Sequence, residues 1–296
     1  MEALDELRTL VARLAARDAR FEPTLPRLHL GHATRPTSPT PLMTAATVAL
    51  VVQGVKRTGL GTRTYEYGSG EVLVTSVRVP LTTQVSRATV REPFLGVGLT
   101  LDPALVASVL LKAPERKRGD TPPGVSTSAA SPELLDAFRR YVRLLDAPGD
   151  VPLLGEAIER EIVWRVLQSP LGAALHETGM ANSASMRVSR AIERLQTDFA
   201  GPLAVANLAR TARMSLATFN RQFRKVTAMS PLQFQKLIRL QEARAQLLSR
   251  AGDVGSVAFT VGYQSPAQFS RDYRRQFGLP PSEDAAQWRR RAPEAF

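Results

Sequence analysis

The chain has 296 residues, of which 44% are hydrophobic and 22% charged, as is typical of globular proteins, and this length accommodates two domains. It has no cysteine, which excludes disulfides, thiol catalysis and thiolate metal sites and is compatible with a cytoplasmic location. No run approaches the roughly 20 apolar residues that a membrane span needs, and the N-terminus lacks the basic and apolar regions of a signal peptide, so neither is expected.

The net charge of +12 is concentrated toward the C-terminus. Residues 186–296 contain 18 Lys and Arg against 8 Asp and Glu, whereas residues 1–185 contain 21 against 19. Because neutralising phosphates releases counterions, this asymmetry favours double-stranded DNA as the partner, with an anionic membrane surface as the competing one.

The first segments of the chain predict a helix and then a β-rich region. Residues 2–20 place apolar side chains at helical spacing between charges, namely Leu4, Leu7, Leu10, Val11 and Leu14. Between Leu42 and Leu101, β-branched runs alternate with glycine-containing turns. The expected strands are Val48–Val55, Arg63–Tyr67, Val72–Val77, Thr82–Val90 and Phe94–Leu101. Such closely spaced strands favour a small barrel or sandwich.

Helices are expected after these strands. Asp102 followed by Pro103 predicts an N-cap and a helix to about Leu111, and the Pro/Gly/Ser-rich stretch Lys112–Ser131 predicts a loop. Further helices are predicted from Pro132 to about Asp146 and from Pro152 to about Gln168. The second of these carries one apolar stripe, formed by Leu154, Ile158, Ile162 and Val166. The two helices would form a hairpin that could join two subunits as a homodimer.

A polar segment near Asn182–Ser185 predicts a linker, followed by a helix from about Met186 to Phe199. The domains are therefore expected to span residues 1–180 and 186–296.

A segment of the basic part occurs twice, fifty positions apart. The first copy contains Ser215, Ala217, Phe219, Arg221, Phe223, Arg224 and Lys225, and the second contains Ser265, Ala267, Phe269, Arg271, Tyr273, Arg274 and Arg275. The aromatic residues stand four apart on one helix face, and arginines lie on the other. Each copy follows a short apolar helix pattern, Leu208–Ala212 or Val257–Val261. Helix, turn and basic helix is the layout of a helix-turn-helix, whose second helix enters the DNA major groove.

A helical projection separates a buried face from a DNA-binding face in each copy. The candidate DNA face comprises Ala217, Asn220, Arg221 and Arg224 in the first copy and Ala267, Ser270, Arg271 and Arg274 in the second, with Gln268 at its edge. Arginine suits guanine, Asn and Gln suit adenine, and alanine suits a thymine methyl. Phosphate contacts are expected from Arg224, Lys225, Arg274 and Arg275. We expect four aromatic side chains to pack in the core and not to stack on bases, namely Phe219, Phe223, Phe269 and Tyr273.

The two copies are connected by a predicted helix that begins at Ser230-Pro231 and ends at about Ala251, before Gly252. A helix of this length spans about 30 Å. Since successive major-groove faces recur every 34–36 Å or so, a rigid connector of this length would place two recognition helices in adjacent groove turns.

Residues 203–282 resemble the DNA-binding domain of the AraC/XylS family of bacterial transcription regulators. The segments that carry the resemblance include Leu208-Ala209, Met214-Ser215, Phe219–Phe223, Met229-Ser230-Pro231, Arg239-Leu240, Ala243-Arg244, Val257-Ala258, Val261-Gly262-Tyr263, Ser265-Pro266, Phe269-Ser270-Arg271, Tyr273 and Phe277-Gly278. The resemblance implies base contacts from Ala217, Asn220, Arg221, Pro266, Ala267, Gln268, Ser270 and Arg271. It also implies activation of transcription through RNA polymerase.

Two positions depart from the family pattern. Arg213 and Ala228 stand where the family usually has glycine, whereas the second copy keeps Gly262 and Gly278. If the backbone is left-handed at Arg213 or Ala228, the side chain costs about 1 kcal/mol there.

The N-terminal half resembles the cupin-like sensing domain of one branch of this family, through Leu50–Gly54, Val72–Val77, Pro80, Glu92-Pro93 and Leu101–Ala104. The resemblance implies an α+β protein in which a small β-barrel with flanking helices binds a small-molecule effector, followed by an all-α double helix-turn-helix domain. The candidate pocket residues are Val48, Leu50, Val72, Val74 and Leu99, although a slip of one residue in register would exchange inside for outside.

No metal or other cofactor is expected. His29 and His32 stand three apart, but the third histidine, His176, is in a helical region, so structural or exposed roles are favoured. Glu156 and Glu159 lie on a predicted helix beside arginines, which favours a solvated face over acid–base catalysis.

The favoured hypothesis is a non-enzymatic, one-component regulator that binds a specific promoter site and responds to a small molecule. A catalytic metal cupin tethered to DNA is the enzymatic alternative, and it requires a bound metal. A third hypothesis is an architectural protein without site preference, whereas a regulator prefers its site by at least about 10³-fold.

Overall fold

The computed structural model describes residues 2–15, 25–114, 123–179, 183–249 and 253–291. The chain divides into two compact units, one comprising Met1–Ser189 with Arg221–Ala228 and the other comprising Arg190–Asn220 with Met229–Phe296. Each unit is described by itself below.

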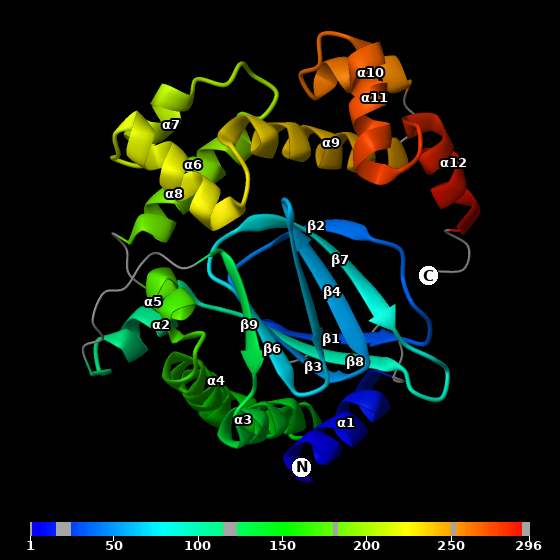
Figure 1. Cartoon of the computed structure of the whole chain (residues 1–296). Coiled ribbons are helices and arrows are strands. Elements are labelled where there is room, and N and C mark those ends of the chain that lie inside the picture. Colours follow the sequence, from blue (N-terminus) through cyan, green and yellow to red (C-terminus); the bar gives the residue numbers. More distant parts are fainter. Residues whose placement is uncertain (1, 16–24, 115–122, 180–182, 250–252, 292–296) are drawn as a thin grey trace. The chain divides into compact units, whose positions relative to one another are not determined.

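The first unit contains two antiparallel sheets in its described part (Figure 1). One has the strand order β1-β8-β3-β6-β9 and the other the order β2-β7-β4-β5. The strands are β1 (Leu28–Ala33), β2 (Thr40–Thr44), β3 (Thr47–Gln53), β4 (Val55–Leu60), β5 (Arg63–Gly68), β6 (Glu71–Thr75), β7 (Val79–Arg87), β8 (Phe94–Thr100) and β9 (Val125–Ala129). The predicted α+β class is confirmed, but the strands form a sandwich of two separate sheets and not the closed barrel of a cupin.

The stretch predicted to be a loop between Lys112 and Ser131 contains strand β9, so that prediction is wrong in its second half. The strand reads Val-Ser-Thr-Ser-Ala, and Val125 is its one fully buried apolar residue. It pairs along its whole length with β6, from Glu71 opposite Ala129 to Thr75 opposite Val125. An edge strand held mainly by backbone hydrogen bonds carries little hydrophobic pattern, and this is why the sequence did not indicate it.

Helices cover the outer face of the five-stranded sheet (Figure 1). They are α1 (Glu2–Ala15), α2 (Pro103–Leu110), α3 (Pro132–Arg143), α4 (Val151–Gln168) and α5 (Gly172–Gly179), with 3-10 turns at Leu144–Asp146 and Pro148–Asp150. The predicted cap at Asp102 is confirmed, because its carboxylate accepts a hydrogen bond from the Ala104 N–H at 2.8 Å. The helix predicted from Pro132 is also capped, since the Ser131 hydroxyl accepts a hydrogen bond from the Leu134 N–H at 3.2 Å. Local capping therefore sets where α2 and α3 begin.

The apolar stripe predicted for α4 is confirmed for three of its four residues. Ile158, Ile162 and Val166 are buried in the core formed by the helices and the five-stranded sheet. Leu154 is 46% exposed, and so is not part of this core, and its neighbour Leu153 is 81% exposed. The first turn of α4 therefore packs against the core through Val151 and leaves two leucines exposed on its other side.

The remaining helices are α6 (Ala184–Thr197), α7 (Val205–Thr211), α8 (Leu216–Thr227), α9 (Pro231–Ser249), α10 (Val254–Thr260), α11 (Pro266–Phe277) and α12 (Pro281–Arg291). Helices α6 and α8 have residues in both units. The helix predicted to connect the two copies is confirmed as α9. Residues 250–252, where it was expected to end, lie outside the described part. Helix α12 was not predicted.

In the second unit, helices α9, α10, α11 and α12 pack together around one apolar core (Figure 1). This core includes Leu240, Ala243, Val257, Phe269 and Tyr273. The prediction that the paired aromatic residues are core is confirmed, since Phe219, Phe223, Phe269 and Tyr273 have no exposed surface.

A buried carboxylate ties α12 to this core. Asp284 accepts hydrogen bonds from Arg244 at 2.8 and 3.0 Å and from the Tyr273 hydroxyl at 2.8 Å. The guanidinium of Arg244 also lies 4.7 Å from the ring centre of Phe277. These contacts hold α11 against α9 and α12, and so fix which of its faces is exposed.

Candidate nucleic-acid interface and ligand cavity

Helix α11 begins at a capped turn. The Ser265 hydroxyl accepts a hydrogen bond from the Gln268 N–H at 3.4 Å, and Pro266 occupies the first helical position. Before it, helix α10 is capped by Asp253, which accepts from the Ser256 N–H at 3.0 Å. The first residues of both helices of the second helix-turn-helix are thus set by local sequence.

The side chains predicted to read bases from α11 lie on its uncovered side. Ala267, Gln268 and Arg271 are exposed, and Pro266 and Ser270 are partly exposed. Phe269 and Tyr273, on the opposite side of the helix, point into the core. One helix therefore presents a polar, basic surface directly opposite its apolar anchor.

The cations of α11 differ in their partners. Arg275 pairs with the buried carboxylate of Asp272, which also pairs with Lys236 of α9 at 2.6 Å. Arg271 and Arg274 form no ion pair with any residue that the structure describes, and both are exposed. These two are accordingly better placed than Arg275 to take a new anionic partner.

The turn of the first helix-turn-helix repeats the backbone hydrogen bonds of the second. Met214 N–H donates to the Ala209 carbonyl at 3.0 Å, as Tyr263 N–H donates to that of Ala258 at 2.9 Å. The connection is shorter, however: residues 212–215 join α7 to α8, whereas residues 261–265 join α10 to α11. The duplication therefore preserves the turn and changes its length by one residue.

The two positions that depart from glycine both have left-handed backbone. Arg213 has φ 51° and Ala228 has φ 56°, while the matching Gly262 and Gly278 have φ 90° and φ 83°. A side chain in this region costs about 1–2 kcal/mol. The strain expected from the sequence is present at both ends of α8.

The residues predicted to read bases from α8 are also exposed. Ala217, Asn220 and Arg221 are uncovered, as is Arg224, and Lys225 is partly buried. The Asn220 side-chain amide donates to the Leu216 carbonyl of its own helix at 3.0 Å. To read a base edge, Asn220 would exchange this internal hydrogen bond for an intermolecular one.

Arg239 of α9 is an important residue that the sequence interpretation did not single out as functional. Its guanidinium donates to the carbonyls of Phe199, Ala200, Gly201 and Gly262, at 2.7 to 3.0 Å. Burial lowers its pKa from the ordinary value, although a guanidinium remains charged. One side chain thereby ties the turn before α11 to the segment after α6.

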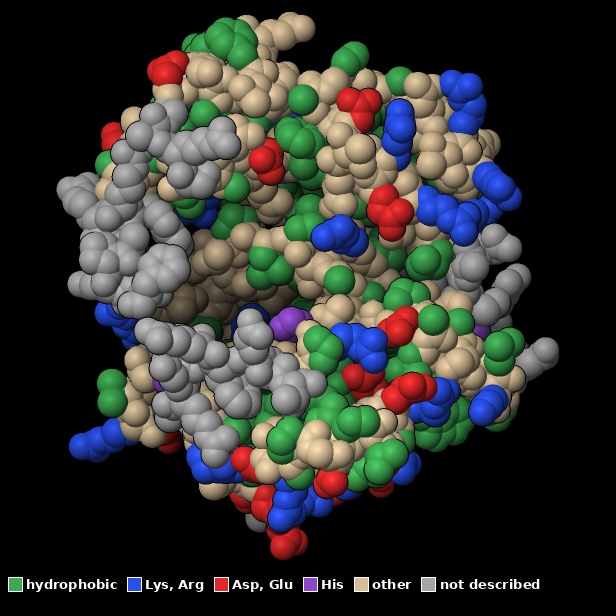
Figure 2. Space-filling model, turned by 180° about the vertical axis from the view of Figure 1, so that it is seen from behind, with side chains coloured by type: hydrophobic (Ala, Val, Ile, Leu, Met, Phe, Trp, Pro, Cys, Tyr) green, Lys and Arg blue, Asp and Glu red, His purple; other side chains and the backbone are tan. Residues whose placement is uncertain are grey.

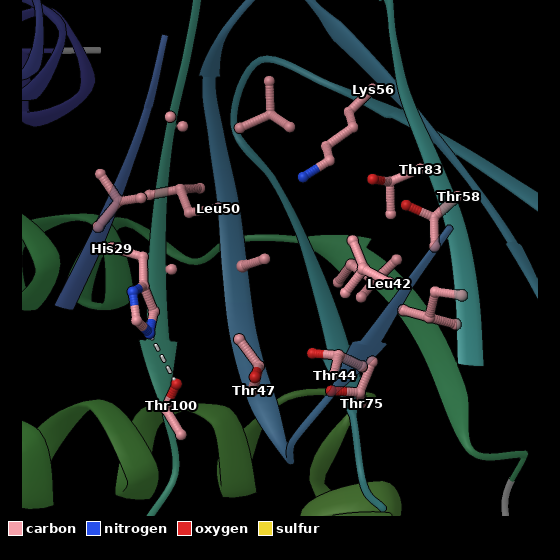
Figure 3. A pocket seen from close by; sticks show the side chains of 18 of the residues that line it. His29, Leu42, Thr44, Thr47, Leu50, Lys56, Thr58, Thr75, Thr83 and Thr100 are labelled. Carbon is pink, nitrogen blue, oxygen red and sulfur yellow. Dashed lines mark hydrogen bonds between the residues drawn. The ribbon is translucent and has the colours of Figure 1, made fainter. Parts of the chain in front are cut away.

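The sandwich encloses a cavity of about 380 Å³ between its two sheets (Figure 3). Small and hydroxyl side chains line much of it, including Thr44, Thr47, Ala49, Thr58, Thr75, Thr83, Gly96, Gly98 and Thr100. Leu42, Leu50, Leu81 and Phe94 contribute apolar surface. A cavity of this size and composition suits a small organic ligand.

Of the five candidate pocket residues, Leu50 is among those that line this cavity. Val48, Val72, Val74 and Leu99 belong instead to the core between the five-stranded sheet and the helices. Successive side chains of a strand point to opposite faces, so Ala49 and Leu73 face the cavity, whereas Leu50 reaches its edge and also belongs to that core. The β-branched pattern therefore marked the face of the sheet that packs against the helices. The face that lines the cavity has smaller and more polar residues.

Lys56 of β4 was not predicted as a site residue, yet it lines the cavity together with Thr58 of the same strand (Figure 3). Burial lowers the pKa of its ammonium group, and burial also raises the pKa of Tyr67 on β5 to about 12. The Thr58 hydroxyl lies 3.4 Å from the Tyr67 hydroxyl. Strand β4 was not among the predicted strands, so the sequence interpretation had no basis for placing the Lys56 side chain in the interior.

The two histidines of β1 have separate surroundings. The His29 ring forms a hydrogen bond with the Thr100 hydroxyl at 2.9 Å at the edge of the cavity, and His32 is exposed. Among the described residues, no three His, Asp or Glu side chains are grouped as metal ligands would be. No helix in the described ranges is both long and apolar enough to cross a membrane.

Acidic and basic side chains are mixed on one face of the molecule. On the face seen in Figure 2, red carboxylate side chains lie among blue basic ones, so no single-sign region covers that face. The uneven charge of the sequence is therefore better followed through individual helices such as α11 than through the whole surface.

A two-sheet sandwich with a cavity and a duplicated helix-turn-helix define the class of a sensing domain attached to a DNA-binding domain. Residues 24–174 match the model of the AraC-type transcriptional regulator N-terminus, and residues 208–287 match that of a helix-turn-helix domain. The chain belongs to the AraC/XylS family of transcriptional regulators with an N-terminal sensing domain.

Individual relatives agree with this assignment. The chain is 30% identical over 133 residues to a putative AraC-like transcription regulator of Streptomyces lividans, covering 44% of each chain. It is 26% identical over 179 residues to the HTH-type transcriptional activator RhaS of Klebsiella pneumoniae, covering 60% of this chain and 63% of that one. The matches thus span less than two thirds of either relative.

The fold is similar to that of ToxT from Vibrio cholerae, solved with a bound unsaturated fatty acid. The TM-score is 0.51 at 11% identity, over 86% of this chain and 93% of that one. At this identity the similarity concerns the fold alone.

Proposed function

We propose that the protein is a sequence-specific DNA-binding regulator that reads a promoter site through helices α8 and α11. The observation that carries the proposal is the exposed face of α11, where Gln268 stands beside Arg271. Arg271 has no ion-pair partner among the described residues, and the opposite face of the helix is anchored by fully buried aromatic side chains. An arginine and an amide side chain are the groups that recognise guanine and adenine in the major groove.

Both helices would take part in recognition. Ala217, Asn220 and Arg221 of α8 and Pro266, Ala267, Gln268, Ser270 and Arg271 of α11 would contact base edges. Arg224, Lys225, Arg274 and Arg275 would contact phosphates. Helix α9 has 19 residues and so is about 28 Å long, which supports binding of the two helices in adjacent major-groove turns.

The sandwich would hold the effector in its cavity. A ligand shifts a regulator between states only by the difference in its affinity for them, so the cavity would have to differ between the DNA-binding states. In this proposal domain 1–180 senses the effector, domain 186–296 binds DNA, and helices within 132–168 pair two subunits. The named activator among the relatives supports activation of transcription, and RNA polymerase would be the partner that the bound protein contacts.

The test begins with selection of bound fragments from random DNA by the full-length chain. The dissociation constant for the selected site is then compared with that for shuffled sequence at one salt concentration. A preference of at least about 10³-fold is expected of a regulator. Equal affinity for both would identify a non-specific architectural protein instead.

A further inference from the structure

Lys56 is the one lysine or arginine among the described residues that line the sandwich cavity, and no Asp or Glu lines it. Lys56 forms no ion pair or hydrogen bond with any other described residue. Its ammonium lies 6.0 Å from the centre of the Phe94 ring, at the outer limit of a cation–π contact. The cavity therefore contains a positive charge that its own walls do not neutralise.

The next residue of the strand, in contrast, forms an ion pair. Arg57 follows Lys56 on β4, and its guanidinium donates two hydrogen bonds to Glu66 of β5, at 2.9 and 2.6 Å, on the exposed side of the sheet. Alternation along the strand explains the opposite directions of the two side chains. The same strand thus carries one neutralised cation outside and one without a counterion inside.

The two ends of the cavity offer different hydrogen-bonding groups (Figure 3). At one end, the hydroxyls of Thr44, Thr47 and Thr75 all donate to the carbonyl of Ala45, at 3.1, 3.0 and 2.8 Å. A hydroxyl has a single proton, so these groups are occupied as donors and present mainly acceptor lone pairs. An anion would find little to bind there.

At the other end, Thr58 shares a face of β4 with Lys56, and Thr83 of β7 stands opposite Thr58 in the register. The Thr83 hydroxyl makes no hydrogen bond to a described residue, so its proton is available for a ligand. Leu42 lies between the two ends (Figure 3), and Leu81 of β7 stands opposite it in the register. One end of the cavity thus has a positive charge and a hydrogen-bond donor, and apolar surface lies next to them.

We propose that the cavity binds an amphipathic monocarboxylate, with its carboxylate at Lys56 and Thr83 and its apolar body against Leu42 and Leu81. The lowered pKa of Lys56 agrees with this arrangement, because burial disfavours the bare ammonium and a bound carboxylate would stabilise it. The inference rests on the proposal that this cavity is the effector site.

The test measures binding of octanoate, octanol and octylamine to the full-length chain by isothermal titration calorimetry at neutral pH. These probes share one alkyl chain and differ in the charge of the head group. Octanoate is expected to bind tightest and octylamine weakest. Equal affinities for octanoate and octanol, or no measurable binding of octanoate, would overturn the proposal.

Three variants assign the effect to Lys56. Lys56→Met should weaken octanoate at least about tenfold and leave octanol within about twofold, since a charge-assisted hydrogen bond contributes on that order. Lys56→Arg should keep the preference for octanoate. The matched control Arg57→Met makes the same change of charge one residue away and should change neither probe. Equal weakening of both probes by Lys56→Met would indicate a structural role and contradict the proposal.

The outcome separates this inference from the function on which it rests. A specific DNA site whose affinity does not respond to octanoate, together with Lys56-dependent binding of octanoate, would retain the ligand site and reject its role as the effector site. Preference for a DNA site without any Lys56-dependent binding would retain the regulator and reject the carboxylate.

Discussion

The carbonyl oxygen of Ala200 lies where a side chain at Gly262 would begin: a Cβ built on Gly262 would stand 2.2 Å from it. Arg239 donates hydrogen bonds to the carbonyls of both residues, and so holds the two backbones together. Gly262 is thus required by close approach as well as by its left-handed φ.

Gly262→Ala should therefore destabilise the protein by more than the left-handed backbone alone would. Gly278 provides the matched control, because its φ is also positive and no atom lies within 4 Å of a Cβ built there. Gly278→Ala is expected to cost about 1–2 kcal/mol, and Gly262→Ala at least about 1 kcal/mol more. Urea unfolding of both variants measures this difference, and equal losses would contradict the role assigned to Ala200.

The opposite change is expected at the end of α8. Ala228→Gly should raise the free energy of unfolding by about 0.5–1 kcal/mol, because glycine removes the steric cost at φ 56° and loses part of that gain to the entropy of the unfolded chain. Ala245, exposed within α9, is the control, and Ala245→Gly should instead cost about 1 kcal/mol. Loss of stability in both variants would mean that the strain at Ala228 is compensated elsewhere.

Arg271 and Arg274 should differ in what they contribute to DNA binding. Arg271→Ala is expected to weaken binding to the selected site by about 1–3 kcal/mol and to relax preference at one base pair. Arg274→Ala should weaken selected and shuffled DNA equally, and should reduce the slope of log affinity against log salt by about 1. Fluorescence anisotropy over a range of salt concentrations separates the two, and equal loss on both DNAs for Arg271→Ala would reject it as a base reader.

Lys56 should make stability depend on pH above neutrality. Its pKa is lowered in the folded state, so between that value and the ordinary lysine value the unfolded chain binds the proton and the folded chain does not. The stability of the wild type relative to Lys56→Met should accordingly rise with pH through this window. The other titratable groups at the cavity are His29 and Tyr67, and Tyr67 stays neutral because its pKa is raised to about 12.

The measurement is urea unfolding of both proteins between neutral pH and about pH 10, the region where lysine ordinarily titrates. Arg57→Met is the control and should show a constant difference from the wild type across this range. A constant difference for Lys56→Met as well would show that its ammonium is not penalised by the cavity.

The helical elements could be predicted well because their signals are local. Asp102, Ser131 and Ser265 cap the helices that follow them, and the aromatic pairs four residues apart are buried. Left-handed backbone at Arg213 and Ala228 could also be anticipated, since comparison of the two copies shows where glycine is missing.

The cavity could not be predicted in the same way. Which face of a strand is inside depends on its pairing and on what covers it, and both are tertiary properties. Val48 and Val74 are more apolar than Thr47 and Thr75, yet the former pack under helices and the latter line the cavity. A lysine in a short strand is ordinarily an exposed residue, and only the opposing five-stranded sheet makes Lys56 an interior one.

The additional residue in the second turn makes the two halves of the duplication structurally unequal. Residue Gln264 lengthens the connection before α11, and one residue of extended chain spans about 3.3–3.6 Å. A base-contacting side chain would therefore meet its base pair at a different angle in each half. Exchanging α8 and α11 would not exchange their preferred bases, and specificity rules established for one helix would need to be established anew for the other.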